Sequence, residues 1–337
     1  MAQTTMDQFF KMKIKNSKRH VFFIDWNQNS PTAKWMSDKP EIVDYESTVS
    51  WRGTGTTIIL CCVDDNSGRS IFPNYTTHYN VPLLKSLLQK SIRRQIDDLA
   101  LMCAKQLIMT DIDSFLRRLF VIMLEDVQLH QCCSGVIWLT SAVTKGYQIT
   151  YRQVDWLMGL VKYLCHDNHK FYKRFVHYPN INVKGFLKMV DMTPIDDTQR
   201  TIIYSIMYRY SYGGMKPDLD MFYYYANNYL GQFIDHIQLE YVAFAPININ
   251  DIKPLRVGDI LINSVDFHCY PQMITIIHNK FPELTDAEIH DTIWECNSKT
   301  NTRWNDPIIP ELSKIWETIH AFVEQLQRNL IDQKKYK

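Results

Sequence analysis

Apolar side chains recur at three- and four-residue steps from Pro82 to Val127, the longest stretch of the chain with a helical pattern. This spacing places them along one side of a helix. The basic pair Arg93 and Arg94 and the acidic pair Asp97 and Asp98 interrupt that side. We therefore expect one helix to end on the basic pair and the next to begin on the acids, which suit its positive N-terminal end.

A third helix is expected after Thr110 or Asp111, either of which can cap it. It carries charges in pairs, namely Arg117, Arg118, Glu125 and Asp126. The arginines precede the acids by two helical turns, so a basic and an acidic group can share one face. One interpretation is an ion-pair clasp between helices. The other is a basic surface for phosphate, formed by Arg93, Arg94, Arg117 and Arg118. Three short helices bury too little to stand alone and must pack together.

Three short runs near the N-terminus have the composition of β-strands. Residues 21–26 and 56–63 are rich in β-branched and aromatic side chains, and residues 46–52 alternate between polar and apolar ones. Gly53 and Gly55 are expected to turn the chain between the last two runs. The pattern predicts a small sheet.

Helical spacing returns at residues 136–143 and 154–164, which we expect to complete the bundle begun at Pro82. Residues 177–198 contain Pro179, Gly185 and Pro194 and are predicted to be a looser connection.

Tyrosines dominate the next stretch, residues 201–231. Gly213 and Gly214 are expected to separate two helices, with Asp218 or Asp220 capping the second. Tyrosines at helical spacing could stack on bases, but they more often pack in a core. The tyrosines concerned are Tyr204, Tyr208, Tyr212, Tyr223, Tyr224 and Tyr225.

Together these patterns predict an α+β fold that is mainly α, with a small N-terminal β-sheet region followed by a helical bundle. The last part of the chain ends in a long amphipathic stretch from Pro310. The predicted segments are a tail at 1–20, a β-rich region at 21–80, a helical bundle at 82–175, a second helical region at 199–330 and a basic tail at 331–337.

Composition narrows the class of protein. The chain has 337 residues, a net charge of +1 and eight cysteines. Near neutrality argues against binding nucleic acid through bulk charge, so any such binding must come from local patches. No apolar run approaches membrane-spanning length, no signal peptide is expected, and the cysteine spacing fits no paired zinc motif. We expect reduced, buried thiols and no metal or cofactor.

The first ten residues contain a short linear motif. It consists of Gln3, then Met6 after two spacers, then Phe9 and Phe10 after two more. This pattern resembles the PCNA-interacting peptide. A single tight helical turn places Met6, Phe9 and Phe10 on one side, as an apolar plug for a pocket. The resemblance implies that the sliding clamp PCNA is a partner, with the Gln3 amide in a small polar pocket.

A basic run follows the motif directly, with no acidic residue between its members. It consists of Lys11, Lys13, Lys15, Lys18 and Arg19. Contact with the acidic rim of the clamp, nuclear import, attraction to DNA phosphate and a solvated linker all fit this run.

Residues 83–127 resemble the helical C-terminal collar region of clamp-loader-like AAA+ proteins, such as the Werner-helicase-interacting protein and replication-associated recombination protein A. The match covers about one seventh of the chain. The phosphate-binding loop G-x-x-x-x-G-K-[ST] is absent from the sequence, so ATP hydrolysis does not carry over. What the resemblance implies is a helical assembly role near DNA. The residues that carry it are Ser91, Arg93, Arg94, Arg117, Arg118, Leu119, Glu125 and Asp126.

Carboxylates at predicted strand ends leave a second function class open. Asp25, Asp64 and Asp65 lie where metal-dependent nucleases often place their ligands, and Asp266 adjoins His268 and Cys269. Ordinary turn acids are commoner, and a buried histidine beside a cysteine is usually structural. Three carboxylates around one cleft would favour a nuclease.

The sequence thus favours a non-enzymatic, PCNA-tethered accessory factor of DNA replication or repair. DNA and other replication or clamp-loader-like proteins are further expected partners. A PCNA-tethered nuclease, or another DNA-processing enzyme, is the alternative. The expected location is the nucleus, which fits the basic run, or a viral replication compartment. The Asn-, Ile- and Lys-rich composition is typical of an AT-rich genome such as that of a large DNA virus.

Overall fold

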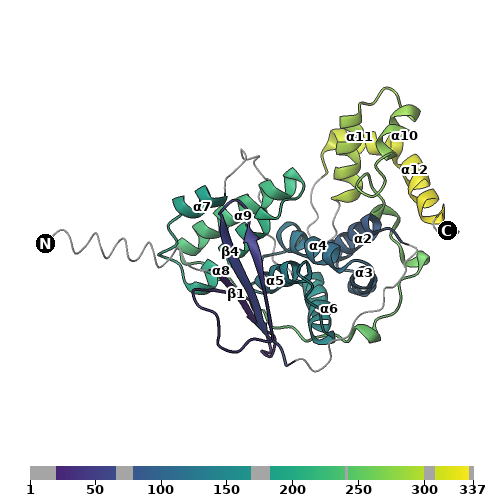
Figure 1. Ribbon diagram of the computed structural model, residues 1–337. Coiled ribbons are helices and arrows are strands. Elements are labelled where there is room, and N and C mark those ends of the chain that lie inside the picture. The colour runs from purple at the N-terminus through teal and green to yellow at the C-terminus, as the bar shows by residue number, and fades with distance from the viewer. Residues whose placement is uncertain (1–19, 66–78, 168–182, 240–241, 300–307, 334–337) are drawn as a thin grey trace. The chain divides into compact units, whose positions relative to one another are not determined.

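The computed structural model describes residues 20–65, 79–167, 183–239, 242–299 and 308–333 (Figure 1). Their contacts divide the chain into two compact units, each assembled from separate stretches of sequence. The first unit draws on 1–69, 129–150 and 172–243, and the second on 70–128, 151–171 and 244–337. None of the helices in the described ranges is both long and apolar enough to span a bilayer.

A mixed four-stranded sheet forms the first layer of the first unit. Its strand order is β2-β1-β4-β3, in which β1 and β4 run parallel and the two outer pairs run antiparallel. Gly53 and Gly55 have φ angles of +79° and +75°, which explains glycine in the turn before β4. The strands are β1 (Val21–Asp25), β2 (Lys34–Met36), β3 (Tyr45–Trp51) and β4 (Thr56–Val63).

Helices complete the described part of this unit, and α5 and α8 pack against its sheet. They are α5 (Cys133–Val143), α7 (Val183–Met189), α8 (Asp197–Ser211) and α9 (Lys216–Ile234). Helix α5 contacts β1 and β4, while α8 contacts β2, α5 and α9. A capping box begins α8, in which the Asp196 carboxylate accepts from the Gln199 N–H at 2.8 Å and the Gln199 amide oxygen accepts from the Asp196 N–H.

Aromatic rings fill the space between the sheet and α8. The Trp35 ring stacks on Phe22 with centroids 4.4 Å apart, and it meets Tyr208 edge-on at 5.4 Å. The Trp35 indole N–H donates to the Ser205 hydroxyl at 3.1 Å, so the polar edge of the ring is satisfied in the interior. Tyr208 is fully buried, which confirms core packing for this tyrosine.

Four helices form the main body of the second unit, in which α2, α3, α4 and α6 pack together. Asn80 caps α2 by accepting from the Leu83 N–H at 2.8 Å, and Asp111 caps α4 by accepting from the Ser114 N–H at 3.0 Å. Gln95, with a φ of +59°, makes the break between the first two helices. The four are α2 (Val81–Arg93), α3 (Asp97–Thr110), α4 (Ile112–Glu125) and α6 (Tyr151–His166).

The C-terminal part of this unit begins with an extended stretch that crosses α6. The Ile247 N–H donates to the Asp155 carbonyl at 2.9 Å, and the chain runs so close to Gly159 that a Cβ there would lie 2.3 Å from the Ala245 oxygen. A helical glycine is required at this crossing, since any larger residue would collide with backbone.

Short helical turns and three further helices complete the second unit. Helix α12 contacts α10, α11, η3 and η4, and η3 also contacts α2. The turns are η1 (Ile249–Asp251), η2 (Val257–Asp259), η3 (Ile262–Ser264) and the π-helix η4 (Trp294–Ser298), and the helices are α10 (Met273–Lys280), α11 (Asp286–Ile293) and α12 (Pro310–Gln333).

The predicted α+β, mainly helical class is confirmed. The three helices between Pro82 and Val127 are confirmed too, with basic residues in the last turn of α2, Asp97 and Asp98 opening α3, and Asp111 at the cap of α4. The predicted strands agree with β1, β3 and β4 to within a residue or two.

Several details of the prediction differ from the structure. Strand β2 was not predicted, and α7 lies inside the predicted connection at 177–198. Residues 133–143 do not complete the bundle begun at Pro82, because α5 packs on the sheet of the first unit. Met215 precedes α9 without a side-chain cap, whereas Asp218 lies in its first turn. The predicted segments are contiguous, whereas each observed unit combines stretches that are far apart in sequence. The two divisions differ because packing contacts between such stretches define a unit.

Candidate functional site

The predicted clamp-binding motif and the basic run after it lie outside the described residues, as does the basic end at 334–337. The residues concerned are Gln3, Met6, Phe9, Phe10, Lys11, Lys13, Lys15, Lys18 and Arg19. Their role stays a prediction. What the structure brings together instead is a network of buried charges centred on α2.

Four side chains on one face of α2 donate hydrogen bonds to the C-terminal part of the same unit. We call this set the donor stripe, and it consists of Ser86, Lys90, Arg93 and Arg94. Their spacing of four, seven and eight residues from the first member keeps them on one side of a helix. The stripe faces the covering segment, which we define as residues 262–298.

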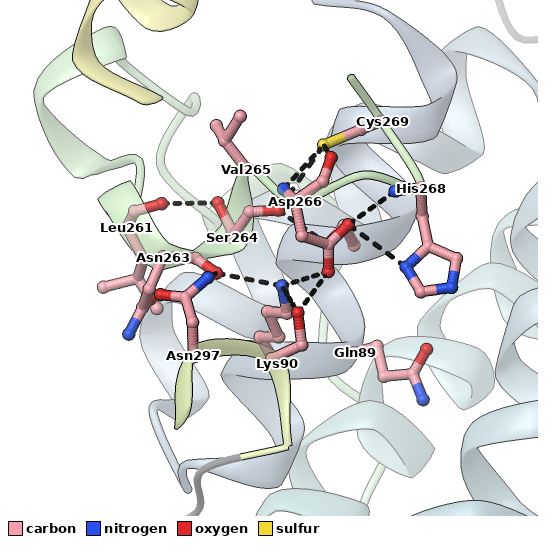
Figure 2. Close-up of polar contacts among 12 residues, drawn as sticks. Gln89, Lys90, Leu261, Asn263, Ser264, Val265, Asp266, His268, Cys269 and Asn297 are labelled. Carbon is pink, nitrogen blue, oxygen red and sulfur yellow. Dashed lines mark hydrogen bonds and ion pairs between the residues drawn. The ribbon is translucent and has the colours of Figure 1, made fainter. Parts of the chain in front are cut away.

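Lys90 lies at the centre of the network and is 3% exposed (Figure 2). Its ammonium donates to the Asp266 carboxylate at 2.6 Å and to the Asn263 carbonyl at 2.9 Å. The same carboxylate oxygen accepts from the Ser298 hydroxyl at 2.7 Å. The buried ammonium and the buried carboxylate are therefore both hydrogen-bonded, as charges in a low-dielectric interior must be.

Arg93 joins three elements through one guanidinium. Its Nε donates to Asp126, its Nη2 to Glu125 at 3.4 Å, and its Nη1 to the Ser298 carbonyl at 2.7 Å. Gln89 lies beside it and donates to both acids, at 2.9 Å and 2.8 Å. The predicted ion-pair clasp is thus present, but Arg93 supplies its base where the sequence suggested Arg117 or Arg118.

The other three arginines have different surroundings. Arg94 donates to the Asn297 carbonyl at 3.0 Å, and its Nη1 is buried without a hydrogen-bond partner in the described part of the chain. Arg118 donates to Gln89 at 3.0 Å, and Arg117 pairs with Asp113 at 2.8 Å on the surface. The structure therefore does not gather the four arginines into one open basic surface, because Arg93 is internal. Phosphate contact by the other three stays a prediction.

Burial and neighbouring charges shift the ionisation of the network. Burial raises the pKa of Asp266, but its bonds to His268 and Lys90 outweigh this and hold the pKa well below its usual range. Burial lowers the pKa of Lys90 despite Asp266. Burial and then Arg93 lower the pKa of Arg94 to about 10, and burial with Asp126 raises the pKa of Glu125.

Asp266 also fixes the local turn that contains His268 and Cys269. Its other oxygen accepts from the His268 N–H at 2.9 Å and lies 3.2 Å from the His268 Nδ1 (Figure 2). The Cys269 thiol contacts the backbone of Asp266 and Ser264. These bonds account for the unusual set of Asp266, His268 and Cys269 as a hydrogen-bonded turn.

Two of the three carboxylates at the strand ends accept hydrogen bonds within the protein, and the third residue donates through its backbone. Asp25 accepts from the Asn27 N–H at 3.0 Å, and Asp64 accepts from the Tyr147 hydroxyl at 3.1 Å. The Asp65 N–H donates to the Asn27 side chain at 3.2 Å. Within the described ranges, no group of three or more His, Cys, Asp or Glu residues is arranged to hold a metal ion.

The eight cysteines all lie in the described residues as buried thiols, and none of them is in a disulfide, as the sequence predicts. Burial raises the pKa of Cys61 to about 11 and that of Cys132 to about 12. Such thiols stay protonated near neutral pH and are poor nucleophiles.

Sequence reasoning missed Lys90 and Ser298 as members of the network. The spacing of the donor stripe along α2 was visible, but its partners are not, since Lys90 and Asp266 are 176 residues apart. Comparison of the chain with protein-family models, curated proteins and solved structures found no match. The network itself can position helices and shield charge.

Proposed function

We propose that this protein is a non-enzymatic accessory factor of DNA replication or repair that is tethered to the sliding clamp PCNA. The observation that carries the proposal is the N-terminal sequence, in which Gln3, Met6, Phe9 and Phe10 have the spacing of a PCNA-interacting peptide. Aromatic anchors of this kind supply most of the binding energy of a small interface.

The residues after the motif support the same proposal. The basic run from Lys11 to Arg19 separates the motif from β1, which starts at Val21. A basic segment next to the plug favours both an acidic clamp rim and DNA phosphate, since both are polyanionic surfaces. The helical body would then contact DNA or another replication protein, with Arg94, Arg117 and Arg118 as candidate contacts.

Calorimetry with purified PCNA tests the proposal. Replacing both anchors, as Phe9→Ala with Phe10→Ala, should weaken binding about a thousandfold, because each anchor contributes about 2 kcal/mol. The matched control changes two spacer residues, Thr4→Ala with Thr5→Ala, and should bind like the unmodified chain. Equal affinity of the anchor variant and the unmodified protein would reject the clamp motif.

A further inference from the structure

The donor stripe of α2 meets oxygen acceptors along its whole length. Ser86 donates to the Ser264 carbonyl at 2.7 Å, and the three cations donate to the carbonyls of Asn263, Ser298 and Asn297. Asp266 adds a carboxylate on Lys90. Phosphate oxygens are acceptors of the same kind, and they bind guanidinium and ammonium groups more strongly than neutral carbonyls do.

The three cations of the donor stripe have their partners in different parts of the unit. Arg93 is paired with Glu125 and Asp126, which belong to α4 and its end and not to the covering segment. Lys90 depends on Asp266, and Arg94 depends on the Asn297 carbonyl, both from the covering segment. Removing that segment would therefore leave two cations without these partners on one face of α2, one helical turn apart.

We propose that Lys90 and Arg94 form a nucleic-acid phosphate site, and that the covering segment occupies it as an internal competitor, with Asp266 in the place of a phosphate. This inference rests on the proposed function, which brings the protein to DNA. Displacement of the covering segment by single-stranded DNA would turn an internal clasp into a binding face, while Arg93 stays paired and keeps α2 attached to α4.

The contacts of the covering segment suit such an exchange. The turn η3 and the π-helix η4 reach α2 through the backbone carbonyls and side chains described above. A π-helix replaces ordinary i to i−4 bonds, and such turns are frequent at functional sites. The carbonyls of Asn297 and Ser298, at the end of η4, are the ones that Arg94 and Arg93 hold.

The test uses the full chain and a fluorescent oligothymidylate, with affinity measured by anisotropy over a range of salt. Asp266→Asn removes the competing charge and should bind at least about tenfold tighter. The slope of log affinity against log salt should stay the same, because both proteins make the same phosphate contacts once the segment is displaced. Lys90→Met combined with Asp266→Asn keeps the net charge of the unmodified protein but removes one of the two phosphate contacts, so it should lose most of that gain, and its slope should fall by about 0.7.

Hydrogen exchange of the unmodified protein tests the proposal even if the Asp266→Asn variant does not fold. Saturating oligothymidylate should increase exchange at residues 262–268 and 294–298 of the unmodified protein, since the segment leaves α2. A folded Asp266→Asn protein with unchanged DNA affinity would overturn the proposal, and so would unchanged or slower exchange in those residues. PCNA affinity should be the same for all variants, so failure here leaves the clamp motif standing, and loss of clamp binding leaves this result unaffected.

Discussion

Two buried contacts, one in each unit of this protein, are held together in different ways. In the first, the rings of Phe22, Trp35 and Tyr208 pack between sheet and helix, with the indole N–H of Trp35 satisfied by Ser205. In the second, Lys90 of α2 and Asp266 of the covering segment form an ion pair where these two elements meet. Their exposed fractions are 3% and 2%. Ring packing does not depend on the charge state of its members, whereas buried charges stabilise only while each keeps its partner.

Removing a partner from the charged network should give the largest loss in the free energy of unfolding. Asp126→Ala leaves the Arg93 guanidinium, 6% exposed, without its closest acid. The free energy of unfolding, measured by urea denaturation, should fall by about 3–5 kcal/mol. A loss below about 1 kcal/mol would mean that the network contributes little to stability.

A change in the ring cluster should cost less and behave differently. Trp35→Phe shortens the ring and leaves the Ser205 hydroxyl without its donor, so we expect a loss of about 2 kcal/mol from cavity and hydrogen bond together. The loss should be the same at low and high salt, since no charge is involved. A salt-dependent loss would contradict apolar packing as the main term.

Hydrogen exchange at low pH should distinguish the two units. The pKa of Asp266 lies well below its usual range in the folded protein, so its contribution is complete above the unfolded value of about 3.9 and is lost as pH falls below it. Residues 262–268 should lose protection below about pH 4, before β1 and β4 do. Asp266→Asn should remove this acid dependence. Equal acid sensitivity in residues 262–268 and in the two strands would contradict the role given to Asp266.

The surface pair of α4 should give the smallest effect. Arg117 and Asp113 are 2.8 Å apart with side chains 44% and 35% exposed, so solvent screens their attraction. Asp113→Ala should change the free energy of unfolding by about 0–1 kcal/mol, in contrast to Asp126→Ala. An effect as large as that of the buried variant would show that exposure does not set the contribution of these pairs.

The sequence was most informative where the determining interactions are local. The Asp111 side chain accepts from the Ser114 N–H three residues later, and this helix start was predicted from the cap candidates Thr110 and Asp111. Strand β2, with three residues, was too short to produce a pattern. The assignment of α5 failed because its periodicity reveals an apolar face but not the surface against which that face packs.

The sequence by itself determined the class of fold, the three helices from Pro82 to Val127, the reduced state of the thiols and the short motif at the N-terminus that motivates the clamp proposal. The tertiary structure alone decided that Arg93 faces inward and that Lys90 meets Asp266. Caps and periodicity act within a few residues of chain. Ion pairs between residues 176 apart depend on how the whole unit folds, and a linear pattern of charges does not specify their partners.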